Sequence, residues 1–181
     1  MSFLDKVIAA VTPPESDEAR IEARRQATAA AAPGDWLSLV LEHHRQIEQA
    51  FAAARQGSSA ADRTAALKRL EIVLTGHSNA EEAVLYPALA DSGEKTHAGA
   101  GYEEQAMTKI QMGILEKLDP MSQDFLDKLG HIEGAVRHHM YAEEGNWFID
   151  LKEKLPAAEQ ARLTARFSEE YERYVGADMA A

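Results

Sequence analysis

The chain has 181 residues and no cysteine, and its 19 basic and 30 acidic side chains give a net charge of -11 with histidine neutral. This length suits one domain with a sizeable core. The lack of cysteine excludes disulfides, thiolate metal sites and thiol nucleophiles, so any metal must be held by histidine, carboxylate, amide, tyrosine or water. The acidic balance should repel nucleic acid and anionic membranes.

Helix-favouring residues dominate the composition and β-branched residues are sparse, which favours an all-α fold. No apolar run is long enough to cross a bilayer. The N-terminal residues lack the basic start and the long apolar run of a signal peptide, so we expect a cytoplasmic protein.

Residues 1–33 are expected to form an N-terminal helical extension. Apolar side chains from Phe3 to Val11 predict a short amphipathic helix that packs on the body or on a partner rather than on a membrane. Residues 16–32 favour a helix by propensity but hold few large apolar side chains. They predict an exposed extra helix or a partly ordered arm, which ends at Pro33 and Gly34.

Residues 34–156 are expected to form four long helices. The expected segments are Asp35–Gln56 with Asp35 as N-cap, a second that starts near Ala61 or Asp62 and ends near Pro87, Tyr102–Leu118, and a fourth from Ser122 or Asp124 to Lys154 with a weak point at Gly145. The glycine-rich residues 91–101, which include His97, predict a mobile connection.

Short connections imply antiparallel neighbours, and therefore an antiparallel up-down four-helix bundle. Residues 157–181 are expected to add a C-terminal helix that packs on this bundle, because 157–175 carry an amphipathic pattern.

Two segments of the chain repeat one pattern of polar residues. His77 and Glu81 stand one helical turn apart, as do His139 and Glu143, so each pair points the same way. Both pairs interrupt an apolar stripe with the spacing of a buried helix face. Burying such groups is costly unless they are paired or bound to a metal.

His44, on the apolar face of the first bundle helix, adds a third imidazole to these two pairs. A bundle can bring inward-facing donors from several helices to the same depth. Carboxylates can bridge two cations and imidazoles suit iron, so the five donors predict a non-haem di-iron centre. A mononuclear iron or zinc site would need fewer of them.

Three motifs carry a resemblance to the hemerythrin-like, HHE cation-binding family: E-H-H-R-x-I at 42–47, H-x-x-x-E-E-x-x-L-Y-P at 77–87 and H-H-x-x-x-E-E-G-x-x-F at 138–148. The resemblance covers roughly residues 34–156. It implies a di-iron centre that is bridged by oxo or hydroxo and carboxylate groups. The ligands that it implies are His44, His77, Glu81, His139 and Glu143.

The third helix departs from that family pattern. Members commonly begin it with Y-E-E-H, whereas residues 102–105 read Y-E-E-Q here. The spacing of Gln105 predicts that it faces inward and can be a weak metal ligand. Glu104, a water or, in a displaced site, His131 are alternatives, and so is an open position on that iron. The substitution argues against reversible oxygen carriage.

Other polar and aromatic residues near the motifs receive simpler interpretations. His43 and His138 are expected at the surface or in contact with a ligand, and Glu48 is a candidate partner for His44. The neighbours of the paired glutamates are expected to orient an imidazole or to lie at the surface. The aromatic residues are expected to form an apolar wall; they are Tyr86, Tyr141, Trp147 and Phe148.

We therefore expect a protein that binds or responds to O2, NO or peroxide in sensing, scavenging or storage, rather than a dedicated enzyme. One alternative is an iron-dependent oxidase-like or peroxidase-like enzyme. Another is a helical interaction module with a structural metal. We expect a small diatomic or peroxidic ligand, no nucleic acid and no membrane, and a protein partner or a second copy at the terminal helices.

Overall fold

The structure is a computed structural model that describes residues 15–178, and within this range every regular element is helical. The expected all-α class is confirmed. The amphipathic segment expected from Phe3 to Val11 lies outside the described residues. Among the helices of residues 15–178, none combines the length and the apolar character needed to cross a membrane.

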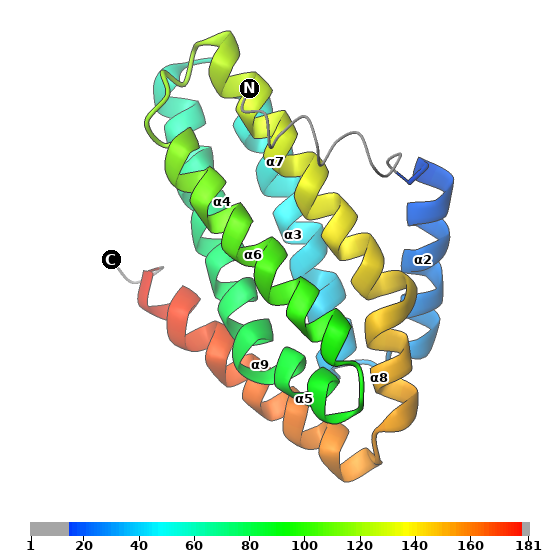
Figure 1. Cartoon of the computed structure of the whole chain (residues 1–181). Coiled ribbons are helices and arrows are strands. Elements are labelled where there is room, and N and C mark those ends of the chain that lie inside the picture. The colour runs from blue at the N-terminus through cyan, green and yellow to red at the C-terminus, as the bar shows by residue number, and fades with distance from the viewer. Residues whose placement is uncertain (1–14, 179–181) are drawn as a thin grey trace.

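Four long helical segments, here called rods, form the bundle (Figure 1). The first rod is α3 (Trp36–Gln56) and the third is α6 (Lys95–Leu115). The second and fourth rods each contain a single π-helical turn: α4 (Ala60–Ala80), η1 (Glu81–Leu85) and α5 (Tyr86–Asp91); and α7 (Gln123–Ala142), η2 (Glu143–Trp147) and α8 (Phe148–Lys154). Rods that follow one another in sequence pack side by side, α3 on α4 and α6 on α7.

Side-chain caps fix where the helices begin. Asp35 accepts a hydrogen bond from the Ser38 N–H at 2.8 Å, which confirms it as the N-cap of α3. Ser59 and Asp62 form a capping box, so α4 starts at Ala60 rather than one or two residues later. Each such cap contributes about 1 kcal/mol.

The glycine-rich connection expected at residues 91–101 is shorter than predicted and covers only residues 92–94. Helix α6 already begins at Lys95, and Ala98 is buried. Gly101 lies against Tyr86, where a Cβ would stand 2.7 Å from the Cζ atom of the ring. Tertiary packing therefore overrides the low helix propensity of glycine at this point.

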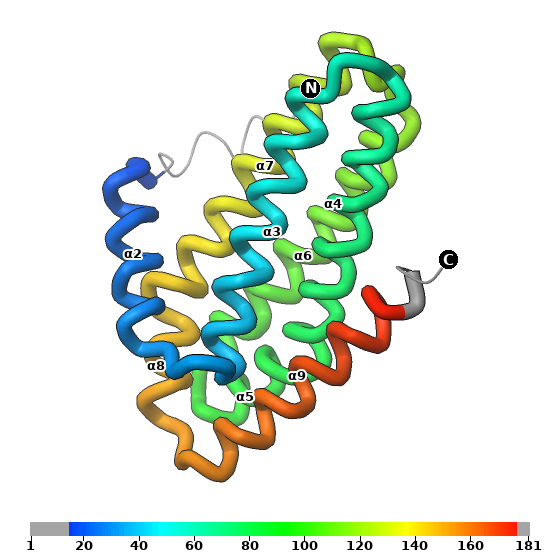
Figure 2. Tube along the Cα trace, turned by 180° about the vertical axis from the view of Figure 1, so that it is seen from behind, coloured from blue at the N-terminus to red at the C-terminus, as the bar shows by residue number. Residues whose placement is uncertain are grey.

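Two further helices flank the bundle, and both views place them on its outside (Figures 1 and 2). Helix α2 (Asp17–Ala30) buries Ala23 and Ala27 and packs against η2, α3 and α8. Of the two alternatives for this segment, the extra helix is therefore confirmed, and one of its faces is buried. Helix α9 (Ala157–Asp178) packs against α3, α4 and η1. Each π-helical turn is thus covered by one terminal helix. The division into three domains stays a prediction.

The core consists of two apolar clusters with a polar layer between them. On α3, Leu41 belongs to one cluster and Ile47 to the other, with His44 between them. On α4, Leu74 and Ala80 flank His77 in the same way. The polar layer is the candidate site.

Candidate metal centre

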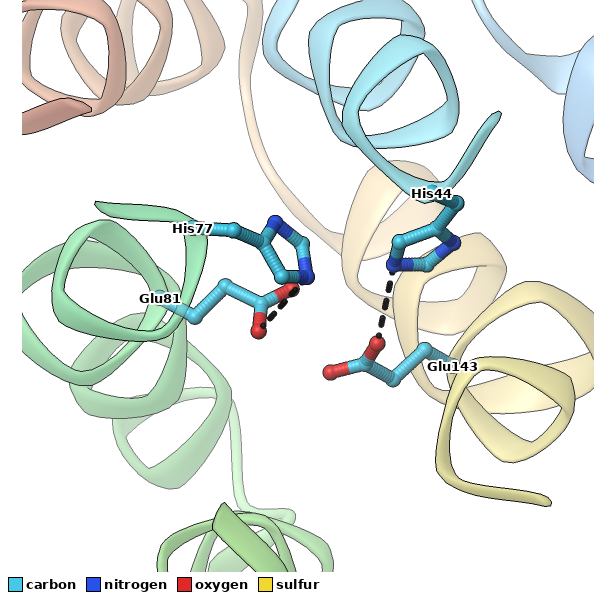
Figure 3. A group of neighbouring side chains, drawn as sticks. All are labelled: His44, His77, Glu81 and Glu143. Atoms are coloured by element: carbon cyan, nitrogen blue, oxygen red, sulfur yellow. Dashed lines mark ion pairs between the residues drawn. The ribbon is translucent and has the colours of Figure 1, made fainter. Parts of the chain in front are cut away.

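Four buried side chains from three rods of the bundle converge in the polar layer (Figure 3). They are His44 of α3, His77 at the end of α4, Glu81 at the start of η1 and Glu143 at the start of η2. One donor atom from each lies within 4.8 Å of the other three. Two imidazole nitrogens and two carboxylates at this spacing can share one cation.

The π-helical turns place each glutamate and the aromatic residue that follows it. Tyr86 donates its backbone N–H to the carbonyl of Glu81, and Phe148 donates to that of Glu143, five residues back in both cases. The extra residue in the turn rotates the following helix, so that residues five apart come onto one side. Such turns occur frequently at functional sites.

At least one nitrogen or oxygen atom of each of the four side chains lacks a hydrogen-bond partner. His77 Nε2 lies 3.3 Å from Glu81 Oε2, and His44 Nε2 lies 3.3 Å from Glu143 Oε2. Both imidazole Nε2 atoms and one oxygen of each glutamate are buried without a hydrogen bond. An unpartnered buried polar atom costs about 1–3 kcal/mol, and a bound cation would satisfy all four at once. The residues therefore fit a metal ion.

Burial and the charges of neighbouring groups shift the pKa values of all four side chains. Burial lowers the pKa of His44, but its carboxylate neighbours outweigh burial and raise it to about 9. Burial opposes ionisation of Glu143, yet the neighbouring imidazoles hold its pKa below the ordinary value. Burial and then the charge of Glu143 raise the pKa of Glu81, and burial lowers that of His77. Metal binding would displace the protons that the site then holds.

His139 lies at the edge of the site rather than within the four-residue group. Its Nε2 atom is 3.2 Å from Glu143 Oε1, and its Nδ1 atom is 2.7 Å from Glu104 Oε2. If Nδ1 carries the proton, Nε2 is free to face the site. Glu104, a sequence candidate for the third-helix ligand, thus contacts the far side of this imidazole.

Gln105 faces inward as predicted and is buried. Its Nε2 donates to Glu81 Oε2 at 2.6 Å and to the Tyr86 hydroxyl at 2.7 Å, while its Oε1 has no partner. Whether this amide binds a metal stays a prediction.

Tyr86 is the site residue that the sequence analysis missed. We expected it in an apolar wall, but its hydroxyl lies 3.2 Å from Glu81 Oε2, 3.1 Å from Glu143 Oε1 and 3.0 Å from His139 Nε2. Burial and the two carboxylates raise the pKa of Tyr86, so it remains a phenol. The five-residue step from Glu81 was the available signal, but it points inward only in a π-helical turn.

Four other histidines lie around the site or at the surface. His43 is buried and contacts a predicted ligand, the second of its two expected positions: its ring lies edge-on to that of His77 with 5.8 Å between centroids, and it stacks on Tyr171 of α9 at 3.7 Å. His97 stacks on Trp147 and stays partly exposed. His131 and His138 are exposed, and His138 contacts Glu15 of the N-terminal extension.

The hydrogen-bond partner of His44 is Glu144, not Glu48. Glu144 Oε1 lies 2.7 Å from His44 Nδ1. Burial opposes its ionisation, but His44 and Arg24 lower the pKa of Glu144, so it is a carboxylate. Glu48 contacts Arg24 instead. Glu82 lies at the surface, with Oε1 2.6 Å from Lys109 Nζ.

Comparison with known proteins relates the chain to one protein family and to a curated protein. The model of the family described as the Hemerythrin HHE cation binding domain matches residues 37–151, which include all residues of the site described above. A DNA nickase of Nostoc sp. (strain PCC 7120) is 26% identical over 94 residues, which are 52% of this chain and 27% of the nickase. The chain thus spans about a quarter of that relative's length. No solved structure matches the chain. The family match and the buried cluster together point to metal binding.

Proposed function

Because the chain belongs to the hemerythrin HHE cation-binding domain family, we propose that it binds two iron ions in the polar layer and responds there to O2, NO or peroxide. The observation that carries this proposal is the set of four buried donor atoms without hydrogen-bond partners, which belong to His44, His77, Glu81 and Glu143. Histidine and carboxylate donors suit iron in both common oxidation states.

The assignment of residues follows their placement. His44, His77, Glu81 and Glu143 would hold the first iron. His139, which lies beside Glu143, and the group at Tyr86 and Gln105 would lie on the side of the second. Iron would supply a redox-active Lewis acid that binds a small ligand.

The protein's own residues would restrict and orient that chemistry. The two apolar clusters on either side of the layer would restrict the access of water to it. Glu104 and Glu144 hold the Nδ1 atoms of His139 and His44, which directs each Nε2 inward. The Tyr86 phenol provides a proton next to both carboxylates.

Sensing, scavenging and storage all agree with such a site. Reversible oxygen carriage is less favoured, because Gln105 stands where the family commonly has a histidine and its Nε2 already donates to Glu81. We therefore place the function in oxygen or redox handling rather than bulk transport.

The proposal is tested by elemental analysis and optical spectroscopy of protein expressed in iron-replete medium. We expect two irons per chain and an absorption that changes when NO, azide or peroxide is added. His77→Ala and His139→Ala should each reduce the iron content, while His138→Ala, at an exposed position, should not. One zinc per chain, or iron that is insensitive to all three ligands, would reject the proposal.

A second candidate function is the turnover of peroxide, and Tyr86 is the observation that favours it. A phenol in contact with two metal-binding carboxylates can give and take back a proton while two peroxide molecules disproportionate to O2 and two water molecules, a reaction that needs no further reductant. Peroxide consumption by the iron-loaded protein, slowed by Tyr86→Phe at unchanged iron content, would support this function. Absence of metal-dependent consumption would exclude it.

We do not extend the proposal to DNA. The matched relative is a nickase over its own full length, of which the match covers 27%. The net charge of -11 also opposes binding to a polyanion.

A further inference from the structure

The carboxylate that orients His44 is itself held by a helix outside the family domain. Glu144 is buried, and its Oε1 lies 2.7 Å from His44 Nδ1. The guanidinium of Arg24 donates to both oxygens of Glu144, from Nε at 3.1 and 3.0 Å and from Nη2 at 2.7 Å. Arg24 belongs to α2, whereas the family match begins at residue 37.

A second carboxylate fixes the guanidinium. Arg24 Nη1 donates to Glu48 Oε2 of α3 at 2.7 Å, so the side chain joins α3 and η2 across the N-terminal helix. A planar fork with two anchors holds a carboxylate in one orientation, which a single ammonium group does less well.

Glu144 would have another position to occupy without Arg24. A cleft of about 380 Å³ lies beside it, lined also by Arg20, Arg137 and Tyr141. Water in this cleft could solvate the carboxylate, which would then turn away from His44. Arg24 therefore favours the rotamer in which Glu144 accepts the His44 Nδ1–H.

We propose that Arg24 is a positioning residue: through Glu144 it fixes the tautomer and ring orientation of His44, so that the N-terminal helix controls how well Nε2 can bind iron. The statement about iron rests on the proposed function, whereas the statement about the imidazole does not. Loss of a group that orients a metal-binding histidine commonly lowers metal affinity about 10- to 100-fold.

The first test is made on the metal-free protein. Long-range proton–nitrogen NMR of the imidazole rings reports which nitrogen of His44 carries the proton. At a pH above about 9, where the His44 ring loses its second proton because of its raised pKa, we expect Nδ1–H in the wild type, protected from exchange. Arg24→Met should give a mixture of tautomers or faster exchange of that proton, and Arg24→Lys should restore part of the wild-type signal. An unchanged Nδ1–H signal in Arg24→Met would overturn the proposal.

The second test is the iron(II) affinity, measured by competition with a chromophoric chelator. Arg24→Met should weaken it about 10-fold or more. Arg20→Met is the matched control, because Arg20 lies on the same helix but contacts Glu15 and Asp17 instead of Glu144. It should stay within about twofold of the wild type. Equal losses in both variants would show a general effect of α2 docking and overturn the proposal.

A double-mutant cycle separates action through Glu144 from other effects. If Arg24 acts through Glu144, Arg24→Met should add little to the loss of affinity already caused by Glu144→Ala. Additive losses would contradict this route. A wild type that binds no iron(II) would refute the proposed function, and the NMR test on the metal-free protein would still decide the role of Arg24.

Discussion

The hydroxyl of Tyr86 lies 3.1 Å from Oε1 of Glu143, although the two residues are 57 positions apart and belong to different rods of the bundle. Tyr86 follows the first π-helical turn as Phe148 follows the second. Phe148 packs edge-on against Trp36 with 5.6 Å between ring centroids. The repeated motif therefore contributes a hydroxyl to the site from one half only, and the site is asymmetric.

Tyr86→Phe should keep the ring in place and remove this hydroxyl. Gln105 would lose an acceptor, and the two buried carboxylates would lose the one O–H donor that lies within reach of both. We expect the metal-free protein to lose about 1–3 kcal/mol of unfolding free energy, measured by urea denaturation. Tyr102→Phe is the control, because that hydroxyl binds a backbone carbonyl near the surface. Equal losses in both variants would argue against a special role for Tyr86.

Gly101→Ala should disturb the site by displacing the ring of Tyr86. The new Cβ would lie 2.7 Å from Cζ of Tyr86 and 3.0 Å from both Cε atoms, so the ring has to move. We expect a loss of about 1–3 kcal/mol. Gly113→Ala, in the same helix with open space around it, should instead gain up to about 1 kcal/mol. Thermal unfolding of the two variants should therefore shift in opposite directions, and a gain for Gly101→Ala would contradict the close packing.

Glu81→Gln should separate stability from metal binding. Burial and the charge of Glu143 raise the pKa of Glu81, which shows that its ionised form is disfavoured in the metal-free protein. The amide keeps the shape without that charge, so the metal-free protein should be as stable as the wild type or more stable by about 1 kcal/mol. Its iron(II) affinity should fall at least about 10-fold.

The neighbouring substitution Glu82→Gln serves as the control for Glu81→Gln. Glu82 forms an exposed ion pair with Lys109, and exposed pairs contribute at most about 1 kcal/mol. Chelator competition measures the iron(II) affinity, and denaturation of chelator-treated protein measures the stability of the metal-free form. A Glu81→Gln variant that binds iron(II) like the wild type would remove Glu81 from the ligand set.

The metal-free protein should lose stability in mild acid through His43. Burial, and then the charge of His44, lower the pKa of His43 to about 4. Between about pH 6.5 and that value the unfolded chain binds the proton and the folded chain does not, so stability present at neutral pH is lost as the pH falls. From about pH 7.5 to about pH 5 this amounts to about 2 kcal/mol.

His43→Phe tests this linkage, since it keeps a ring that can stack on Tyr171. Denaturation at both pH values should show that the wild type loses more stability on acidification than the variant. Equal losses would mean that other groups cause the acid sensitivity.

The sequence by itself determined the helical class, the inward side of each rod and the His-Glu pairs, because these depend on local periodicity. His44, His77, Glu81 and Glu143 meet as their spacing predicts, and the start of α3 follows from the local capping chemistry of Asp35. The inward position of Gln105 was predictable for the same reason.

Only the tertiary structure decided the rest. The first π-helical turn brings Tyr86 onto the same side as Glu81, five residues earlier. In an ordinary α-helix with 3.6 residues per turn, residues five apart do not lie on one side. The position of Gly101 in a helix depends on packing, because the ring of Tyr86 lies where a side chain at this position would be. The link from Arg24 to Glu144 joins residues 120 positions apart. Such contacts depend on which surfaces meet in three dimensions, and local sequence pattern does not encode that information.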